Sequence, residues 1–384
     1  MKLQQEKLNI ELKNNLSFWL NHAINKNTNI FYSSISIDGK PNSSEPIGAM
    51  YLSRILYGAS TGCNLLNTNE YLNLAVLSFN ELQEFHNPKG GYYWAKNKSN
   101  VFIHDPENTN MAQAFVLYGL VAFAKIKPSS ELDDLINKQF NFIKNTLYDS
   151  RNGGYIDGFN ENWELGETVT KALGTHLHLL EAFVKRYEFK KDEELVQPIE
   201  ELITLILKHF ITKNTYDCLH RLTPDWKPLD NEIWAGHNAE CSWILCYAAG
   251  AINSDNLLTT CNNLALKMVN QVLLSALDKK NGGIYNILKN DFPTESVKIW
   301  WPQAETVLAL LNCFNITKDY KYQSHAKKLI NYISNNFISP NGEWYTEISN
   351  TGKPNTAIPI VHFWKSMYHS VRYYEMITIL TNKF

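Results

Sequence analysis

The sequence has no surplus of charge of either sign and no long apolar run. Its 36 basic residues against 38 acidic ones leave a net charge of −2, so no basic field is available to attract nucleic acid or an anionic membrane. No stretch approaches the roughly 20 consecutive apolar residues of a membrane-spanning helix, and residues 1–24 lack the short apolar block of a signal peptide. We therefore expect a cytoplasmic protein with neither nucleic-acid nor membrane partners.

Cysteine is also scarce, and its spacing fits neither a disulfide framework nor a metal site. The six cysteines form no CxxC pair, which predicts reduced thiols. The sequence contains no HExxH motif and no close set of His, Cys and Asp, so we expect no bound metal. A phosphate-binding loop of the GxxxxGK[ST] type is absent as well.

Aromatic residues, in contrast, are plentiful. The chain of 384 residues contains 10 Trp, 20 Tyr and 18 Phe. Such a composition suits a large core, and it also suits a pocket that stacks flat rings on the faces of a sugar. The length allows two or three average domains or one large closed architecture.

A turn followed by a short strand recurs along the chain at a nearly constant interval. Gly90-Gly91, Gly153-Gly154 and Gly282-Gly283 each run into aromatic or β-branched residues, which is typical of a turn that enters a strand. The steps are 61, 63, 61, 68 and 60 residues between Phe31, Tyr92, Tyr155, Tyr216, Ile284 and Trp344. This period predicts a fold built from six copies of one unit.

The intervals between these turns carry paired helical patterns. One helix of a pair is apolar nearly all round, as in residues 114–121, and must be buried, whereas its partner is polar on one face and covers it. The apolar periodicity predicts twelve helices: 8–24, 50–60, 71–85, 112–126, 132–147, 168–187, 194–211, 239–251, 257–277, 304–314, 322–337 and 369–380.

Six such pairs close most simply into two concentric rings. We therefore predict an all-α fold, an (α/α)6 barrel with short β-hairpins at the active-site end, and a single domain over residues 1–384 that exists as a monomer or homodimer. An open helical solenoid is the alternative. A solenoid needs polar capping repeats, however, and the last segment of the chain is no more polar than the middle ones.

The first turns of the buried helices carry polar residues. Residues 236–243 are the clearest case, because His237, Glu240 and Trp243 fall on one face of the helix that begins there. A charged or imidazole group on a buried helix costs several kcal/mol unless it is paired or hydrated, so we expect these residues to share one cavity. The candidates are Arg54, His176, His178, Glu181, His237, Glu240, Trp243, Trp300, Trp301, Glu305, Trp364, Lys365, His369 and Arg372.

Two reaction classes remain open for such a cavity. Glycoside hydrolysis needs two carboxylates about 5–10 Å apart, which Glu240 and Glu305 could supply. Proton transfer at a carbon beside a carbonyl suits histidines, whose ordinary pKa of about 6.5 lets them take and return a proton at neutral pH. Three histidines at the pocket favour proton transfer, and inverting a stereocentre asks for bases on both faces of a planar intermediate. A protein that binds sugar unchanged is a further alternative, but it gives no reason for the histidines.

Four segments resemble the motifs of the N-acylglucosamine 2-epimerase superfamily, in particular those of its cellobiose and mannose 2-epimerases. Residues 171–182 resemble K-S-M-N-T-H-L-H-V-L-E-A, and residues 236–240 resemble G-H-D-x-E. Residues 300–305 resemble W-W-x-Q-A-E, and residues 363–369 resemble F-W-K-C-P-Y-H. The resemblance covers nearly the whole chain. It implies an (α/α)6 barrel that epimerises an aldose at C2 without a cofactor.

The resemblance also implies roles for individual residues. His237 and His369 would be the general acid/base pair that removes and returns the C2 proton on opposite faces of a cis-enediolate. His178 would hydrogen-bond the reacting end of the opened sugar, and Glu240 would orient His237 or tune its charge. Arg54 would stabilise the enediolate oxygens. The substrate-binding set would be Arg54, Trp301, Glu305, Trp364, His176, Trp243 and Phe115, with His176 acting from behind His178.

The chain departs from the family pattern at a few positions. Asn238 stands where the motif often has Asp, Ser366 and Met367 replace Cys-Pro, Ser370 replaces Asn, and Met111 stands where cellobiose epimerases usually have Tyr. None of these changes removes a proposed catalytic group, and the preferred sugar stays open between a disaccharide and a monosaccharide such as mannose. The nearest alternative is an aldose–ketose isomerase that uses the same histidines to move the proton from C2 to C1.

Overall fold

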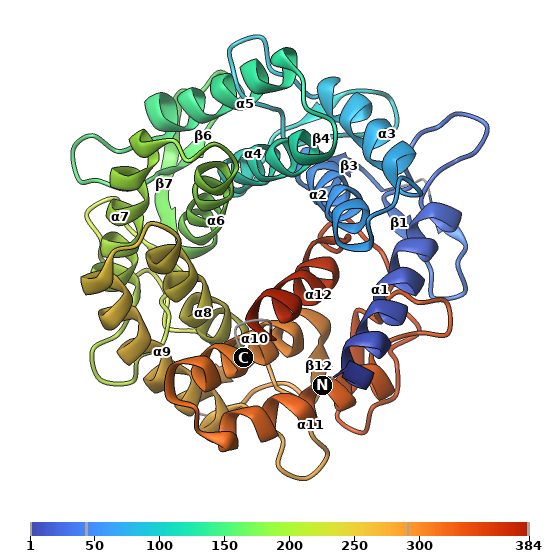
Figure 1. Ribbon diagram of the computed structural model, residues 1–384. Helices are drawn as coiled ribbons and strands as arrows, with labels where there is room; N and C mark the ends of the chain where they lie inside the picture. The colour runs from blue at the N-terminus through green and yellow to red at the C-terminus, as the bar shows by residue number, and fades with distance from the viewer. Residues whose placement is uncertain (1, 43–44, 290–291, 382–384) are drawn as a thin grey trace.

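The α-helices form two concentric rings, which Figure 1 shows in a view along the barrel axis. The computed structural model describes residues 2–42, 45–289 and 292–381. The inner ring consists of α2 (Ala49–Leu66), α4 (Thr109–Ile126), α6 (Leu173–Lys190), α8 (Ala235–Ala251), α10 (Trp300–Thr317) and α12 (Tyr368–Thr381). The outer ring consists of α1 (Lys2–His22), α3 (Leu72–Gln83), α5 (Ser130–Phe142), α7 (Val196–Leu205), α9 (Asp255–Ser275) and α11 (Tyr320–Asn336). Each predicted helix is therefore present.

The inner ring is closed. Each inner helix packs against the next, and α12 packs against α2. Each also packs against an outer partner, with α1 covering α12. The (α/α)6 barrel is thus confirmed and the open solenoid is wrong. Because the first helix of the chain packs against the last and the inner ring is closed, we propose, as the sequence predicts, that residues 1–384 form one domain.

Burial separates the two rings as the sequence patterns predict. Along α4 almost every residue is buried, whereas α5 buries one face, formed by Leu132, Ile136, Gln139 and Phe140. In the described part of the chain, α4 is the one helix that is long and apolar enough to cross a membrane, and 78% of that window lies inside the protein. Its place in the inner ring accounts for its apolarity.

Short antiparallel strands stand at the end of the barrel where the inner helices begin. In the described residues they form five small sheets, ordered β1-β2, β3-β4-β5, β6-β7-β8, β11-β10-β9 and β12-β13. Strands β3, β7, β9 and β12 run directly into α2, α6, α8 and α10. The strand bounds are β1 Ser34–Ile35, β2 Pro41–Asn42, β3 Ile47–Gly48, β4 Ala95–Lys96, β5 Phe102–Ile103, β6 Asp157–Phe159, β7 Leu165–Ala172, β8 Arg221–Leu222, β9 Ile233–Trp234, β10 Ile287–Lys289, β11 Phe292–Pro293, β12 Val297–Ile299 and β13 Glu347–Ser349.

Two local predictions are wrong. Residues 168–172, predicted as helix, are the end of β7, since this stretch contains β-branched residues that favour a strand and pairs with β6 and β8. Tyr216, predicted to enter a strand, has a φ of 61° and lies in the turn itself. The strand bridge of that repeat forms two residues later, between Ile211 and Cys218.

A glutamine near the start of an inner helix holds the strand bridge of its repeat. In α4, Oε1 of Gln113 accepts a hydrogen bond from Tyr92 N at 2.9 Å, and its Nε2 donates to Tyr92 O at 2.8 Å. In α10, Gln303 holds both backbone groups of Ile284, each at 2.8 Å. These clamps tie an inner helix to the turn that precedes it, which is a physical reason for the repeat period.

Lys365, a candidate for the cavity, belongs to the fold instead. Its Nζ is buried and donates to Glu343 Oε1 at 2.8 Å and to Ile360 O at 2.6 Å. Lys298, which precedes α10, pairs with Asp278 in a similar way at 2.8 Å. A buried lysine of this kind fastens a turn to the start of an inner helix.

Candidate active site

A cavity of about 690 Å³ opens at the hairpin end of the barrel. Its wall is built from the first turns of several inner helices and from the strands beside them. Eight of the candidate residues line this wall: Arg54 of α2, His178 of α6, His237 and Glu240 of α8, Trp300 and Trp301 of α10, Trp364 from the loop before α12, and His369 of α12.

The indole of Trp301 lies beside both of the histidines proposed as acid and base. Its ring centroid is 5.0 Å from that of His237 and 5.6 Å from that of His369. A close approach to α8 makes this possible, because a Cβ on Gly236 would come within 2.4 Å of the indole. Two imidazoles far apart in the sequence therefore contact the same ring at one cavity wall.

Glutamates stand behind two of the three predicted histidines that line the cavity. Nδ1 of His369 lies 2.8 Å from Glu305 Oε1, and Nδ1 of His178 lies 3.0 Å from Glu181 Oε2. An ionised carboxylate accepts the Nδ1–H and leaves Nε2 as the basic nitrogen. Burial and the positive charge of Arg372 hold the pKa of His369 well below its ordinary value, so its neutral, proton-accepting form prevails at neutral pH.

Arg372 supplies the counter-charge for three buried glutamates. Its guanidinium forms ion pairs with Glu181, Glu240 and Glu305, the last at 2.7 Å. Burial alone would lower the pKa of Arg372, but these carboxylates raise it well above its ordinary value. For Glu181, burial alone would raise the pKa. Arg372 and His178 more than offset this rise, so the pKa of Glu181 is lowered to about 2. A metal ion among these carboxylates would have to displace the guanidinium.

Two glutamates have partners that differ from the predicted ones. Glu305, expected to contact the sugar, is fully buried behind the wall, where its Oε2 accepts a hydrogen bond from Trp243 Nε1 at 3.0 Å. Glu240, expected to orient His237, forms an ion pair with Arg372. Oxygens of the two carboxylates lie within 4.8 Å of each other, around one guanidinium. They cannot straddle a glycosidic bond there, which disfavours the hydrolase hypothesis.

His176 faces away from the cavity, contrary to its place in the predicted substrate-binding set. Its Nε2 accepts a hydrogen bond from Tyr155 N at 3.1 Å, and its Nδ1 donates to Ala172 O at 2.8 Å. The ring therefore clamps the bridge of its repeat, as Gln113 does in α4. Burial lowers the pKa of His176 to about 4. Residues two positions apart on a helix do not share a face, so His176 and His178 point in different directions.

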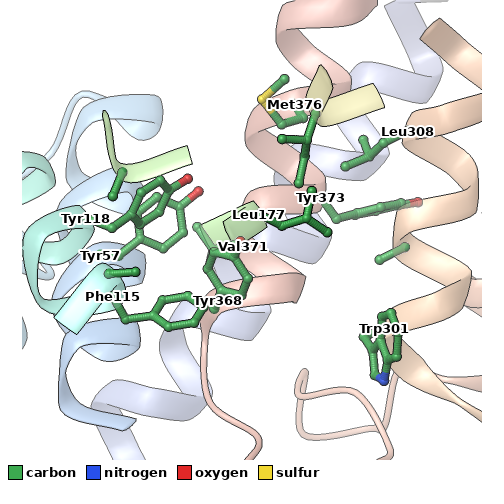
Figure 2. Packing of buried hydrophobic residues seen from close by; sticks show 14 of the residues in the cluster. Tyr57, Phe115, Tyr118, Leu177, Trp301, Leu308, Tyr368, Val371, Tyr373 and Met376 are labelled. Atoms are coloured by element: carbon green, nitrogen blue, oxygen red, sulfur yellow. The ribbon is translucent and has the colours of Figure 1, made fainter. Parts of the chain in front are cut away.

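Phe115 and Trp243, also predicted to bind substrate, lie beneath the wall. The guanidinium of Arg54 stands 4.1 Å above the Phe115 ring, and Phe115 packs edge-on against Tyr368 at 4.7 Å (Figure 2). Trp243 donates to Glu305. In this arrangement Phe115 can affect a ligand through Arg54, and Trp243 through Glu305, rather than by direct contact.

Arg54 and Trp364 meet at the cavity wall. Nη1 of Arg54 donates to Trp364 O at 2.9 Å. Burial lowers the pKa of Arg54 to about 10, which leaves the guanidinium charged at neutral pH. Trp364 is 43% exposed, and its indole is available to stack on a ligand at the mouth of the cavity.

Two aromatic residues of the wall, His220 and Trp234, were not predicted from the sequence. Nδ1 of His220 lies 3.2 Å from Nδ1 of His237, and Trp234 stacks on His237 at 5.1 Å with an interplanar angle of 16°. Trp234 directly precedes the helix that begins with the G-H-x-x-E motif, and its position was a usable signal. His220 lies just before the two-residue strand β8, where no periodicity marks it.

Comparisons with known proteins agree with this architecture. The model of the N-acylglucosamine 2-epimerase (GlcNAc 2-epimerase) family matches residues 31–372. A cellobiose 2-epimerase from Dictyoglomus turgidum is 27% identical over 370 residues, which cover 93% of each chain. The solved structure of a cellobiose 2-epimerase from Bacillus thermoamylovorans superimposes with a TM-score of 0.88 at 22% identity, covering 98% of this chain and 99% of that one. A D-mannose isomerase superimposes with a TM-score of 0.86 at 18% identity over 97% of each chain.

Proposed function

The chain belongs to the N-acylglucosamine 2-epimerase family, and from this premise we propose that it is a sugar 2-epimerase that inverts C2 of an aldose by histidine-mediated proton transfer. Curated relatives that match most of the chain include cellobiose 2-epimerases, which are enzymes of the isomerase class. The proposed substrates are a cellobiose-type disaccharide, mannose or glucose. The observation that carries the proposal is that His237 and His369 line one cavity and contact one indole.

The proposed reaction moves one proton off C2 and another onto its opposite face. In the opened sugar, a neutral imidazole takes the C2 proton, the C–H electron pair forms the C1=C2 bond, and the C1 oxygen becomes an alkoxide. The second imidazole, which has taken up a proton from solvent, then gives it to the other face of C2, and the C1 carbonyl returns. The first imidazole releases the abstracted proton to solvent. His237 and His369 are the proposed pair, and no electron leaves the sugar, so the route uses no redox cofactor.

The surroundings of His237 and His369 support their proposed roles as the acid/base pair. Glu305 fixes the ring of His369 through Nδ1, which directs the basic nitrogen to the cavity. Arg54 presents a cation at the wall for the enediolate oxygens, and interactions of this kind are often the largest single contribution to catalysis. His178, held by Glu181, is the proposed hydrogen-bond partner of the reacting end.

The size and rim of the cavity are compatible with a disaccharide as well as a monosaccharide. A volume of about 690 Å³ lies within the range of small-molecule sites.

Of the departures from the family pattern, Met111 lines the cavity, whereas Asn238 is buried and accepts a hydrogen bond from Cys218 N at 2.7 Å. Acidic side chains that can accept hydrogen bonds from sugar hydroxyls also line it: Glu107, Asp230, Glu232 and Glu295.

Incubation with cellobiose, mannose and glucose in D2O, followed by proton NMR, tests the proposal. Deuterium at C2 of the epimer is the expected result. Accumulation of a ketose would favour the aldose–ketose isomerase, and release of glucose from cellobiose would favour the hydrolase. If none of these sugars exchanges its C2 proton, the proposed function is wrong. The cytoplasmic location and the monomeric or homodimeric state stay predictions.

A further inference from the structure

His178, His237 and His369 all line the cavity but differ in what stands behind them. His178 and His369 each have a glutamate oxygen at Nδ1, at 3.0 and 2.8 Å. His237 has the imidazole of His220 there, with 3.2 Å between the two Nδ1 atoms. The two rings also pack together, with centroids 4.8 Å apart.

We propose that His220 is the positioning residue of His237: it holds the Nδ1 edge of that ring, the place that a glutamate takes behind the other two histidines. This inference rests on the proposed function, in which His237 is one of the two proton carriers. With Nδ1 engaged by His220, Nε2 is the nitrogen of His237 that remains for a ligand in the cavity.

Both rings are held firmly enough for such a role. His237 lies between aromatic neighbours, with Trp234 at 5.1 Å and Trp301 at 5.0 Å between ring centroids. Trp234 also contacts His220 at 4.6 Å. The backbone of His220 is fixed to the start of α6, because its carbonyl oxygen accepts a hydrogen bond from Leu173 N at 2.9 Å.

An imidazole partner suits a residue that must alternate between two protonation states. A neutral imidazole has one donor and one acceptor nitrogen. Its acceptor nitrogen can take the hydrogen bond from Nδ1–H of His237, which leaves Nε2 of neutral His237 basic, and the same bond persists when His237 is an imidazolium. A carboxylate can only accept, and its charge would favour the imidazolium. His220 therefore serves both states of His237 without adding a charge.

The groups around His237 and His220 favour the neutral form of both rings. His237 faces His220 and, across the cavity, His178 of α6 and His369 of α12, while Glu240 lies one turn along its own helix. Burial first, and then these three histidines, hold the pKa of His237 well below its ordinary value. Burial and the neighbouring Arg221 lower the pKa of His220 to about 4. Both rings are therefore neutral at neutral pH, and the Nδ1–H of one can donate to Nδ1 of the other.

Three substitutions of His220 separate positioning from packing. His220→Asn keeps a neutral donor and acceptor near the place of Nδ1, and we expect kcat within about fivefold of the wild type. His220→Leu removes the hydrogen bond, and we expect kcat to fall about 10- to 100-fold, with KM within about threefold. His220→Asp puts a charge behind His237 and should raise its pKa by more than about one unit. His325→Leu, on the outer helix α11, is the matched control and should change none of these values.

The decisive readout is the ring NMR of His237 in the full-length protein without sugar. Nitrogen–proton correlations of His237 give its tautomer and its pKa, and both should change in His220→Leu and His220→Asp but stay near wild type in His220→Asn. Unchanged ring signals and an unchanged kcat in His220→Leu would overturn the proposal, as would a loss in His220→Asn as large as that in His220→Leu. A wild-type protein that epimerises no sugar would refute the proposed function, while the ring signals would still decide whether the two histidines are paired.

Discussion

Oε1 of Glu305 lies 2.8 Å from Nδ1 of His369 and is the same oxygen that pairs with Arg372 at 2.7 Å. One buried carboxylate thus orients a proposed base and balances a buried guanidinium. Burial raises the pKa of Glu305, and Arg372 opposes this rise. The orientation of His369 and the charge balance under the cavity therefore depend on a single side chain.

Replacing this carboxylate should slow proton transfer more than it weakens sugar binding. In Glu305→Gln the amide keeps a similar shape but lacks the charge, and we expect kcat to fall about 10- to 100-fold with KM within a few-fold. C2 proton exchange in D2O measures the effect. Glu305→Ala removes the hydrogen bond as well and should be slower still. A Glu305→Gln enzyme with wild-type kcat would show that His369 needs no carboxylate.

The two histidines of α6 provide a matched pair. His178→Gln should reduce kcat by about 100-fold or more, since His178 lines the cavity. His176→Gln should keep kcat within about threefold, because glutamine performs the same clamping role at positions 113 and 303. Steady-state kinetics on the two variants are the measurement. An equal loss of kcat in both variants would contradict the assignment of His178 to the cavity and of His176 to the fold.

His176 should also make the barrel sensitive to mild acid. Its folded pKa of about 4 lies below the value of about 6.5 in the unfolded chain. As the pH falls from 6.5 towards 4, the unfolded chain binds a proton that the folded protein does not, so the free energy of unfolding decreases. For this group the loss is about 2 kcal/mol at pH 5. Above pH 6.5 the group has no effect.

The variant His176→Gln isolates this contribution. Denaturant midpoints at pH 7 and pH 5 should show a smaller drop for the variant than for the wild type, because glutamine does not titrate. The other buried histidines still titrate in both proteins and cancel in the comparison. Parallel drops in the two proteins would mean that His176 is not the acid-sensitive group.

Loss of Arg372 should destabilise the whole barrel. Arg372→Met leaves three buried glutamates without their shared counter-charge, and removing one partner of a buried ion pair costs about 3–5 kcal/mol. Arg372→Lys should also be destabilising, because an ammonium group cannot reproduce the planar fork of a guanidinium. Chemical denaturation gives the free energies of unfolding. Arg151→Lys at an exposed position is the control and should stay within about 0.5 kcal/mol.

Two glycines at equivalent places in α6 and α8 make a steric test. In Gly236→Ala the new Cβ would come within 2.4 Å of Trp301, and this indole would have to move away from His237 and His369. We expect about 1–3 kcal/mol of destabilisation and a kcat at least about tenfold lower. In Gly174→Ala the nearest atom is Met111 Sδ at 3.7 Å, so thermal stability should not fall. A stable and fully active Gly236→Ala protein would contradict the close packing of Trp301.

The barrel was predictable because its signal repeats. The Gly-Gly turns and the alternation of all-apolar and one-sided helices recur at steps of about sixty residues, and a physical cause of that period is visible in clamps such as Gln113 and Tyr92. Local boundaries were less predictable. Residues 168–172 continue an apolar and polar pattern that fits a helix, and only pairing with β6 and β8 makes them a strand.

The site was predictable in its members more than in their contacts. The polar first turns pointed to the residues that line the cavity, but no spacing in the sequence reveals that Arg372 takes Glu240 and Glu305 as partners across the ring. The position of His176 was foreseeable from the helical repeat, since His178 already occupied the cavity face. His220 was not foreseeable, because its contact with His237 arises from a loop that α6 and β8 place.

Helix α12 follows every other helix in the chain and carries both His369 and Arg372. During synthesis α6, α8 and α10 therefore emerge with Glu181, Glu240 and Glu305 before the guanidinium that pairs with them. A prematurely terminated product would hold repelling carboxylates at its centre and an open seam beside α2, and it would be a target for proteolysis rather than a slow enzyme. The charge balance beneath the cavity and the proposed acid/base pair are thus both completed by this one helix.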